Sequence, residues 1–192
     1  MCAAPTSAGI GRSRMNIHRT AEDIHIINAV DPSAVRTRFR EVLAHFGSGV
    51  VVITSIDSSG APVGMTVGSF TSISIEPPLV GFFAGHNSTT LPHVLGNSEF
   101  CVNVLSEDQH SLARVFARSG SDKFEGVDWT PSINGSPRLA GAHAWIDCTV
   151  DEHRAIGDHR FVVGGVGALV VPATSDPLVF HRSLFHGLRA HR

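Results

Sequence analysis

Short β-branched and apolar runs separated by turn residues dominate this chain of 192 residues. The clearest run is residues 50–56, Val-Val-Val-Ile-Thr-Ser-Ile, which is followed by Asp-Ser-Ser-Gly at 57–60. A run of this kind predicts a buried strand, and the turn predicts that residues 62–65 return as its hairpin partner. Further strands are predicted at 70–75, 79–83, 100–104, 144–150, 160–171 and 178–181.

Helices are predicted to be few. Asp31 and Pro32 form a typical helix start, and apolar residues follow at helical spacing. Two shorter helices are predicted at 91–95 and from Ser106, where Gln109 completes a capping box. Strand and long helix never alternate, so the sequence predicts a mainly β fold, a closed or split antiparallel barrel with a few flanking short helices.

The chain is expected to form one domain, residues 31–192, preceded by a flexible arm, residues 1–30. No apolar run follows Arg12 and Arg14, so no export signal is expected and the protein is predicted to be cytoplasmic. No stretch approaches the roughly 18 apolar residues of a membrane span. The length leaves no room for separate cofactor and substrate domains.

Charge and metal-ligand patterns exclude several functions. Fifteen basic and 17 acidic residues give a net charge of −2, which favours no nucleic-acid partner. Twelve histidines occur without ligand spacing, so no metal site is expected. Cys101 and Cys148 lie in apolar strands and are predicted to be buried, inert thiols.

A glycine-rich run at 164–167, Gly-Gly-Val-Gly, resembles a fragment of a dinucleotide-binding fingerprint. That fingerprint requires a helix directly after it, whereas residues 168–171 read as a strand. The run therefore predicts a bend or a close backbone contact within a barrel strand.

Three other segments carry residues suited to a polar, flat ligand. Residues 64–74 are rich in small and hydroxyl residues, which let a ring approach the backbone, although an edge strand with a wet face explains them equally well. Residues 86–89, His-Asn-Ser-Thr, precede a predicted helix and suit a phosphate or an ordinary N-cap. Residues 157–159, Gly-Asp-His, form a turn in which nothing structural requires His159.

Taken in order, these segments resemble the flavin reductase family of the FMN-binding split-barrel type, over about residues 39–188. The resemblance rests on FGSGV at 46–50, GMTVGSF at 64–70, SIEPPLV at 74–80, FCVNVL at 100–105, DKFEG at 122–126, GDH at 157–159 and FHR at 180–182. It implies a split antiparallel barrel that binds FMN or FAD and NADH or NADPH.

The resemblance also implies site residues. Beside the flavin ring it places Met65, Thr66, Val67, Gly68 and Ser69. By the ribityl chain and phosphate it places His86, Asn87, Ser88 and Leu91, and toward the phosphate or adenine it places Ala117, Arg118 and Lys123. On the nicotinamide side it places His159, as the residue that orients the nicotinamide, together with Phe180, His181, Arg182 and Ser183. Gly68 stands where relatives often carry a larger polar residue.

The implied function is an NAD(P)H:flavin oxidoreductase that supplies reduced flavin to a partner monooxygenase and forms a homodimer. One alternative is a flavin-binding or electron-relay protein without turnover on the same fold. A second is an enzyme with bound flavin that passes electrons to ferric iron or a quinone.

Overall fold

A computed structural model describes residues 32–120, 122–172 and 175–188. The arm predicted for residues 1–30 lies outside the described residues. The described residues from 41 onward form one compact unit. Helix α1, Pro32–Leu43, begins at the predicted proline, and Val42 and Leu43 at its C-terminal end are more than half exposed.

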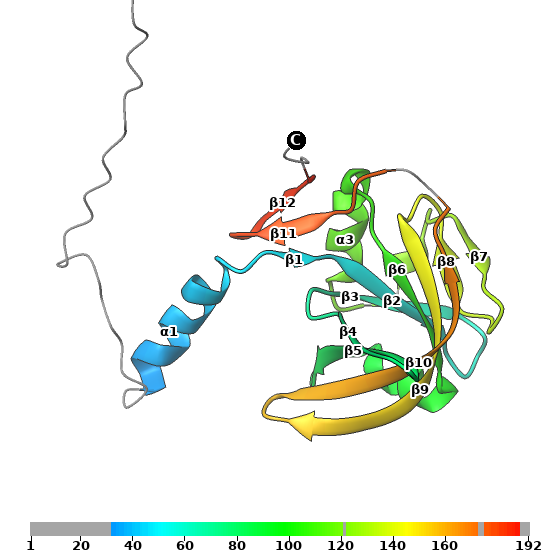
Figure 1. Cartoon of the computed structure of the whole chain (residues 1–192), viewed down its shortest axis with the longest axis horizontal. Coiled ribbons are helices and arrows are strands. Elements are labelled where there is room, and N and C mark those ends of the chain that lie inside the picture. Colours follow the sequence, from blue (N-terminus) through cyan, green and yellow to red (C-terminus); the bar gives the residue numbers. More distant parts are fainter. Residues whose placement is uncertain (1–31, 121, 173–174, 189–192) are drawn as a thin grey trace, which may run out of the picture. The chain divides into compact units, whose positions relative to one another are not determined.

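A seven-stranded antiparallel sheet forms the barrel (Figure 1). Its strand order is β3-β2-β6-β9-β10-β5-β4. The strands are β2 (Val51–Ile56), β3 (Pro62–Val67), β4 (Thr71–Ile75), β5 (Pro78–Gly85), β6 (Glu99–Val104), β9 (Ala144–Ile156) and β10 (His159–Val170). The mainly β, split-barrel fold expected from the sequence is confirmed.

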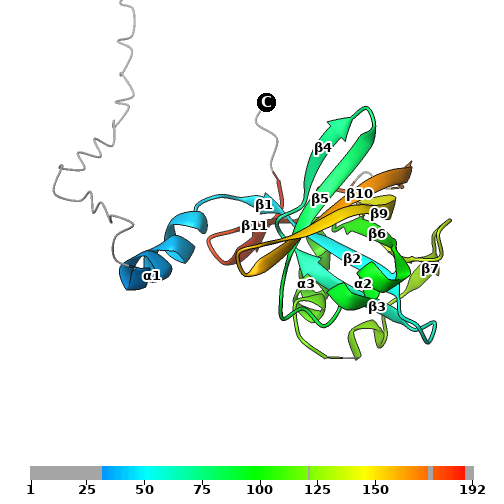
Figure 2. The same ribbon diagram turned by 90° about the horizontal axis from the view of Figure 1, so that it is seen from below.

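The two edges of this sheet are consecutive in the chain, because β3 is directly followed by β4. Between them, the Ser69 hydroxyl donates to the carbonyl of Phe83 on β5 at 3.1 Å and accepts from its N–H at 3.0 Å. The linker therefore bridges the opening of the sheet. Figure 2 shows β4 and β5 as a hairpin that projects from the barrel.

Strand β2 is buried along almost its whole length because both of its faces meet a core. Val51 and Ile53 point into the barrel interior, where Phe82, Phe100 and Val162 also pack. Val52 belongs to a second core with Phe116, Leu139 and Leu178. This two-sided burial explains the unbroken β-branched run, since successive residues of a strand face opposite sides.

The remaining elements flank the barrel. Helix α2 (Leu91–Asn97) follows β5, and α3 (His110–Phe116) follows a 3₁₀ turn (Glu107–Gln109) that carries the predicted Ser106–Gln109 capping box. A second 3₁₀ turn spans Asp122–Phe124. Two small sheets consist of β1 (Ser48–Gly49), β11 (Val179–His181) and β12 (Leu184–His186), and of β7 (Trp129–Pro131) and β8 (Pro137–Leu139).

The glycine run at 164–167 lies inside β10, as predicted, and the register against β9 shifts at both of its ends. A side chain at Gly164 would meet the ring of Phe100 at 2.5 Å and Cβ of Cys148 at 3.2 Å. The run is thus a site of close packing. Cys101 and Cys148 are buried free thiols, and burial raises the pKa of Cys148 to about 12. None of the helices in the described part of the chain is long and apolar enough to cross a membrane.

Candidate functional site

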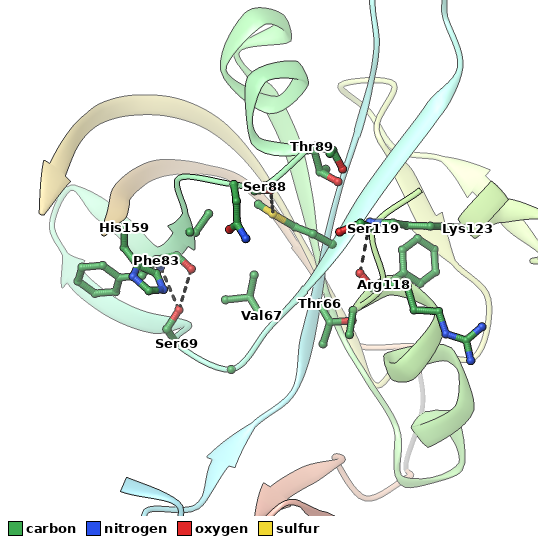
Figure 3. Close-up of a pocket in the computed structure, with 18 residues that line it drawn as sticks. Thr66, Val67, Ser69, Phe83, Ser88, Thr89, Arg118, Ser119, Lys123 and His159 are labelled. Carbon is green, nitrogen blue, oxygen red and sulfur yellow. Dashed lines mark hydrogen bonds between the residues drawn. The ribbon is translucent and has the colours of Figure 1, made fainter. Parts of the chain in front are cut away.

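A cavity of about 400 Å³ opens where the end of β3, the β3–β4 linker, the loop after β5 and the end of α3 meet. Figure 3 shows His159 and Phe83 at one end, Lys123 and Arg118 at the other, and Val67 and Ser88 between them. The lining residues are Met65, Thr66, Val67, Gly68, Ser69, Phe83, Ala84, Gly85, Asn87, Ser88, Thr89, Thr90, Phe116, Ala117, Arg118, Ser119, Lys123 and His159.

Side-chain hydroxyls fix several parts of the wall to one another. The Thr66 hydroxyl donates to the carbonyl of Ala113 at 2.7 Å and so ties β3 to α3. The Ser88 hydroxyl donates to the sulfur of Met65 at 3.3 Å and accepts from the N–H of Leu91 at 3.2 Å. The wall is thereby held before any ligand enters, which lowers the entropic cost of binding.

Lys123 is buried at one end of the cavity, where only 7% of it is exposed. Its ammonium donates to the carbonyl of Gly64 at 2.9 Å and to that of Phe116 at 3.5 Å. The Thr90 hydroxyl donates to the same Gly64 carbonyl at 2.9 Å. Burial disfavours the charged form and lowers the pKa of Lys123. A buried cation with incomplete solvation favours an anionic ligand beside it.

His159 stands at the opposite end, on the first residue of β10. Its Nδ1 lies 2.6 Å from a carboxylate oxygen of Asp158, and this hydrogen bond is the main cause that lowers the pKa of Asp158. His86 stabilises the same turn, because its Nε2 lies 2.9 Å from the carbonyl of His159 and its backbone N–H donates to the carbonyl of Asp158 at 3.1 Å. The imidazole of His159 is therefore oriented at the cavity mouth.

The glycines of the small-residue segment have different environments. Gly64 does not line this cavity; a side chain there would lie 2.6 Å from the ring of Phe116. Gly68 does line it, and a side chain there would lie 3.1 Å from the hydroxyl of Ser48. Gly64 is therefore required for packing against Phe116. Gly68 leaves space at the cavity wall that a side chain would fill.

The structure brings most of the sequence-predicted residues into this one cavity. They are Met65, Thr66, Val67, Gly68, Ser69, Asn87, Ser88, Ala117, Arg118, Lys123 and His159. Lys123 is buried and is not a solvated surface charge. In Figure 3 the guanidinium of Arg118 extends away from Val67.

Six predicted residues lie elsewhere. His86, in the loop after β5, and Leu91, at the start of α2, line a neighbouring cavity instead. Phe180, His181, Arg182 and Ser183 belong to the β11–β12 hairpin, which pairs with β1 in a separate sheet and does not line the main cavity.

Sequence reasoning missed other lining residues, among them Phe83, Phe116 and Ser119. The ring of Phe83 stacks at 4.7 Å from that of Phe161, so an apolar pair of neighbouring strands borders the His159 end. The sequence places Phe83 in a predicted strand but does not show that its side chain lines a cavity. Its register, opposite Phe161 on β10, was the missing information.

A metal centre is not formed by the described residues, in which no group of three or more His, Cys, Asp or Glu side chains gathers to hold an ion. The fold and the cavity instead define a β-barrel protein with a polar cleft that has a histidine at one end and a buried lysine at the other.

Comparison with known proteins identifies the family. The sequence profile of the flavin reductase like domain matches residues 43–189. A flavin reductase of Pseudomonas putida is 41% identical over 85% of this chain and 94% of its own. The reductase subunit HsaB of a flavin-dependent monooxygenase from Rhodococcus jostii is 42% identical over 83% of this chain and 80% of its own.

A solved structure agrees with this assignment. The NADH:FAD oxidoreductase SgcE6 of Streptomyces globisporus, determined with NAD and FAD fragments, superposes with a TM-score of 0.77 at 33% identity, over 85% of this chain and 98% of its own. The chain belongs to the flavin reductase-like family. The sequence-based prediction of a nicotinamide-dependent flavin reductase is confirmed.

Proposed function

We propose that the 400 Å³ cavity is where the flavin and the nicotinamide meet, and that the chain reduces flavin for a separate monooxygenase. One observation carries the proposal: a single cleft holds an oriented histidine at one end and a buried lysine at the other. The relatives named above include a flavin reductase and a monooxygenase reductase subunit, which supports the same activity for this chain.

The cavity fits a flavin in size and chemistry. Its volume lies in the range of roughly 300–1,000 Å³ that small-molecule sites occupy. Small residues border it from Val67 to Ser69, and hydroxyls surround its middle. The ammonium of Lys123 is suited to the phosphate end of the ligand, and Met65 and Val67 supply apolar contact for a ring.

When bound, a flavin accepts a hydride from a nicotinamide and supplies the electron-transfer chemistry of the reaction. The chain positions the two rings and shields them from water. His159 orients the nicotinamide by hydrogen bonding, Asp158 holds the imidazole, and the Phe83–Phe161 pair gives that end an apolar border. No residue of the wall is required as an acid or a base.

The β11–β12 hairpin supports a homodimer. Arg182 and Ser183 at its turn have φ angles of 50° and 64°, a left-handed backbone in which Asn-Gly is favoured. Non-glycine residues at such positions cluster at functional sites. Phe180 and Leu184 expose 40% and 58% of their surface. In a homodimer this hairpin would complete the nicotinamide side of the partner's cavity, which gives its side chains a role.

Purified protein mixed with NADH or NADPH and with FMN or FAD tests the activity, by loss of nicotinamide absorbance. We expect flavin-dependent oxidation, and we expect His159→Ala to raise the KM for the nicotinamide about tenfold while flavin affinity changes less, since one tenfold step corresponds to the loss of roughly one good hydrogen bond. If no flavin supports nicotinamide oxidation, the chain is a flavin-binding module without turnover. Light scattering of the purified chain tests the homodimer.

A further inference from the structure

A second cavity, of about 420 Å³, lies beside the first, and the proposed function assigns no ligand to it. It is lined by His86, Ser88, Leu91, Pro92, Leu95, His153, Ala155 and Arg160. Ser88 lines both cavities, so they share one wall. We call this second cavity the Arg160 cavity.

The β9–β10 hairpin separates the two cavities. Successive residues of a strand face opposite sides, so His159 lines the first cavity and Arg160 lines the second. On β9, Ala155 pairs with Arg160 and His153 pairs with Val162, which places them on the same face as Arg160. Figure 1 shows β9 and β10 side by side as one long hairpin.

The Arg160 cavity has one basic side. Arg160 donates from Nη1 to Nδ1 of His153 at 2.8 Å. Because a guanidinium has only donors, Nδ1 of His153 is the acceptor, and a neutral ring carries its proton on Nε2. The remaining guanidinium N–H groups and that Nε2–H are a donor set suited to phosphate oxygens.

The opposite side of the cavity is apolar. Leu91, Pro92 and Leu95 form it, and Leu91 is nearly completely buried. None of the described residues that line the cavity carries a carboxylate. Glu152, which precedes His153 in the sequence, pairs with Val163, so strand alternation places it on the other face of the hairpin. A ligand with an anionic part and a flat apolar part matches this pair of walls.

From this arrangement we infer that the Arg160 cavity binds the adenosine 5′-phosphate half of a dinucleotide. Arg160 and His153 bind the phosphate, and the purine lies on Leu91, Pro92 and Leu95. The inference rests on the proposed function, which supplies two dinucleotides with this half, FAD and the nicotinamide substrate. Because Ser88 lines both cavities, the other half of either one would lie in the first cavity.

Isothermal titration with adenosine 5′-phosphate alone tests the site directly. The variants are Arg160→Gln and His153→Gln. The matched control is Arg154→Gln, which removes a positive charge from the same hairpin at a position that lines neither cavity. Loss of one charge-assisted hydrogen bond corresponds to about tenfold or more in Kd. We expect Arg160→Gln to weaken adenosine 5′-phosphate at least tenfold and Arg154→Gln to change it less than twofold.

Two further measurements identify which dinucleotide places its adenosine 5′-phosphate half in the Arg160 cavity. If it is FAD, flavin fluorescence titration shows weaker FAD binding in Arg160→Gln with FMN binding unchanged. If it is the nicotinamide, the KM for NADH rises about tenfold with FMN as acceptor. No binding of adenosine 5′-phosphate by the unmodified protein overturns the inference. Equal weakening of FMN and FAD does so too, since FMN lacks this half. Retained NADH oxidation with FMN in either case leaves the proposed function intact.

Discussion

The carboxylate of Asp158, in the turn that joins β9 to β10, lies 2.6 Å from Nδ1 of His159, the first residue of β10. A carboxylate only accepts, so Nδ1 carries the proton and the other ring nitrogen of a neutral imidazole is left as an acceptor. Both residues are partly or fully exposed, so the pair stabilises an orientation more than it stabilises the fold.

We therefore expect Asp158→Ala to act through His159. The KM for the nicotinamide should rise about two- to fivefold, as for the loss of one exposed hydrogen bond to a carboxylate, with flavin affinity and kcat nearly unchanged. Steady-state kinetics and flavin titration measure both. Asp57→Ala is unsuitable as a control because Asp57 organises its own turn, so Asp151→Ala, on β9, is used instead. An equal loss in both variants would show a general charge effect.

Because Lys123 is buried, the free energy of unfolding is expected to vary with pH in the alkaline range. Burial lowers its pKa from the usual 10.5, so between the lowered value and 10.5 the unfolded chain holds a proton that the folded chain has lost. Stability rises with pH wherever the unfolded state binds more protons. The contribution of this residue is thus least favourable at low pH and improves as pH rises through that window.

Lys123→Met removes this dependence. The unfolding free energy of the natural chain, minus that of the variant, should increase as the pH rises from the lowered pKa of Lys123 toward 10.5, by at most about 1.4 kcal/mol per pH unit. Urea unfolding at each pH measures it, and all other titrating groups cancel in the difference. A difference that falls with pH would contradict the buried, charged lysine. Saturating flavin phosphate should reduce the dependence by pairing with the ammonium.

Gly164 is required by packing. A methyl group there meets the Phe100 ring at 2.5 Å, so Gly164→Ala should lower the unfolding free energy by about 1–3 kcal/mol. Gly96 in α2 has nothing within 4 Å of an added Cβ, and Gly96→Ala should raise it by about 0.5–1 kcal/mol. Denaturant unfolding of the two variants gives opposite signs if both environments are as described.

The β11–β12 turn should show a conflict between stability and activity. Ser183→Gly relieves a left-handed backbone at φ 64° and should raise the unfolding free energy by about 1 kcal/mol. If the turn serves the nicotinamide side, the same variant should raise the KM for the nicotinamide. A more stable protein with an unchanged KM would assign the turn to structure alone.

Much of the fold can be predicted from the sequence because local sequence patterns agree with the structure. The run at 50–56, the Asp57–Gly60 turn and the Ser106–Gln109 capping box each specify a structure without long-range information. The glycine run at 164–167 is also interpretable, because a strand follows it in the sequence. The end of β9 could not be predicted from the sequence. The strand continues from residue 150 to Ile156, where polar and charged residues show no alternation of polar and apolar side chains.

The site was harder to predict because its walls come from distant segments. Met65 to Ser69 and His159 share a cavity through the pairing of β10 with β5 and the bridge from Ser69 to Phe83, neither of which is visible in the local sequence. The burial of Lys123 could not be predicted, because it depends on carbonyl partners from β3 and α3. A role for Arg160 could not be predicted from the sequence, because its partner His153 lies on the other strand of a hairpin.

Because side chains alternate along β10, a single peptide bond separates the residues that line two different cavities. His159 and Arg160 are neighbours in the chain, yet their side chains enter different cavities. A one-residue deletion between Ile156 and His159 that shifted β10 by one position would exchange these two side chains, and it would also turn the fully buried Val162 out of the barrel core. The strand register that fills the barrel core thus also decides which side chain each of the two cavities receives.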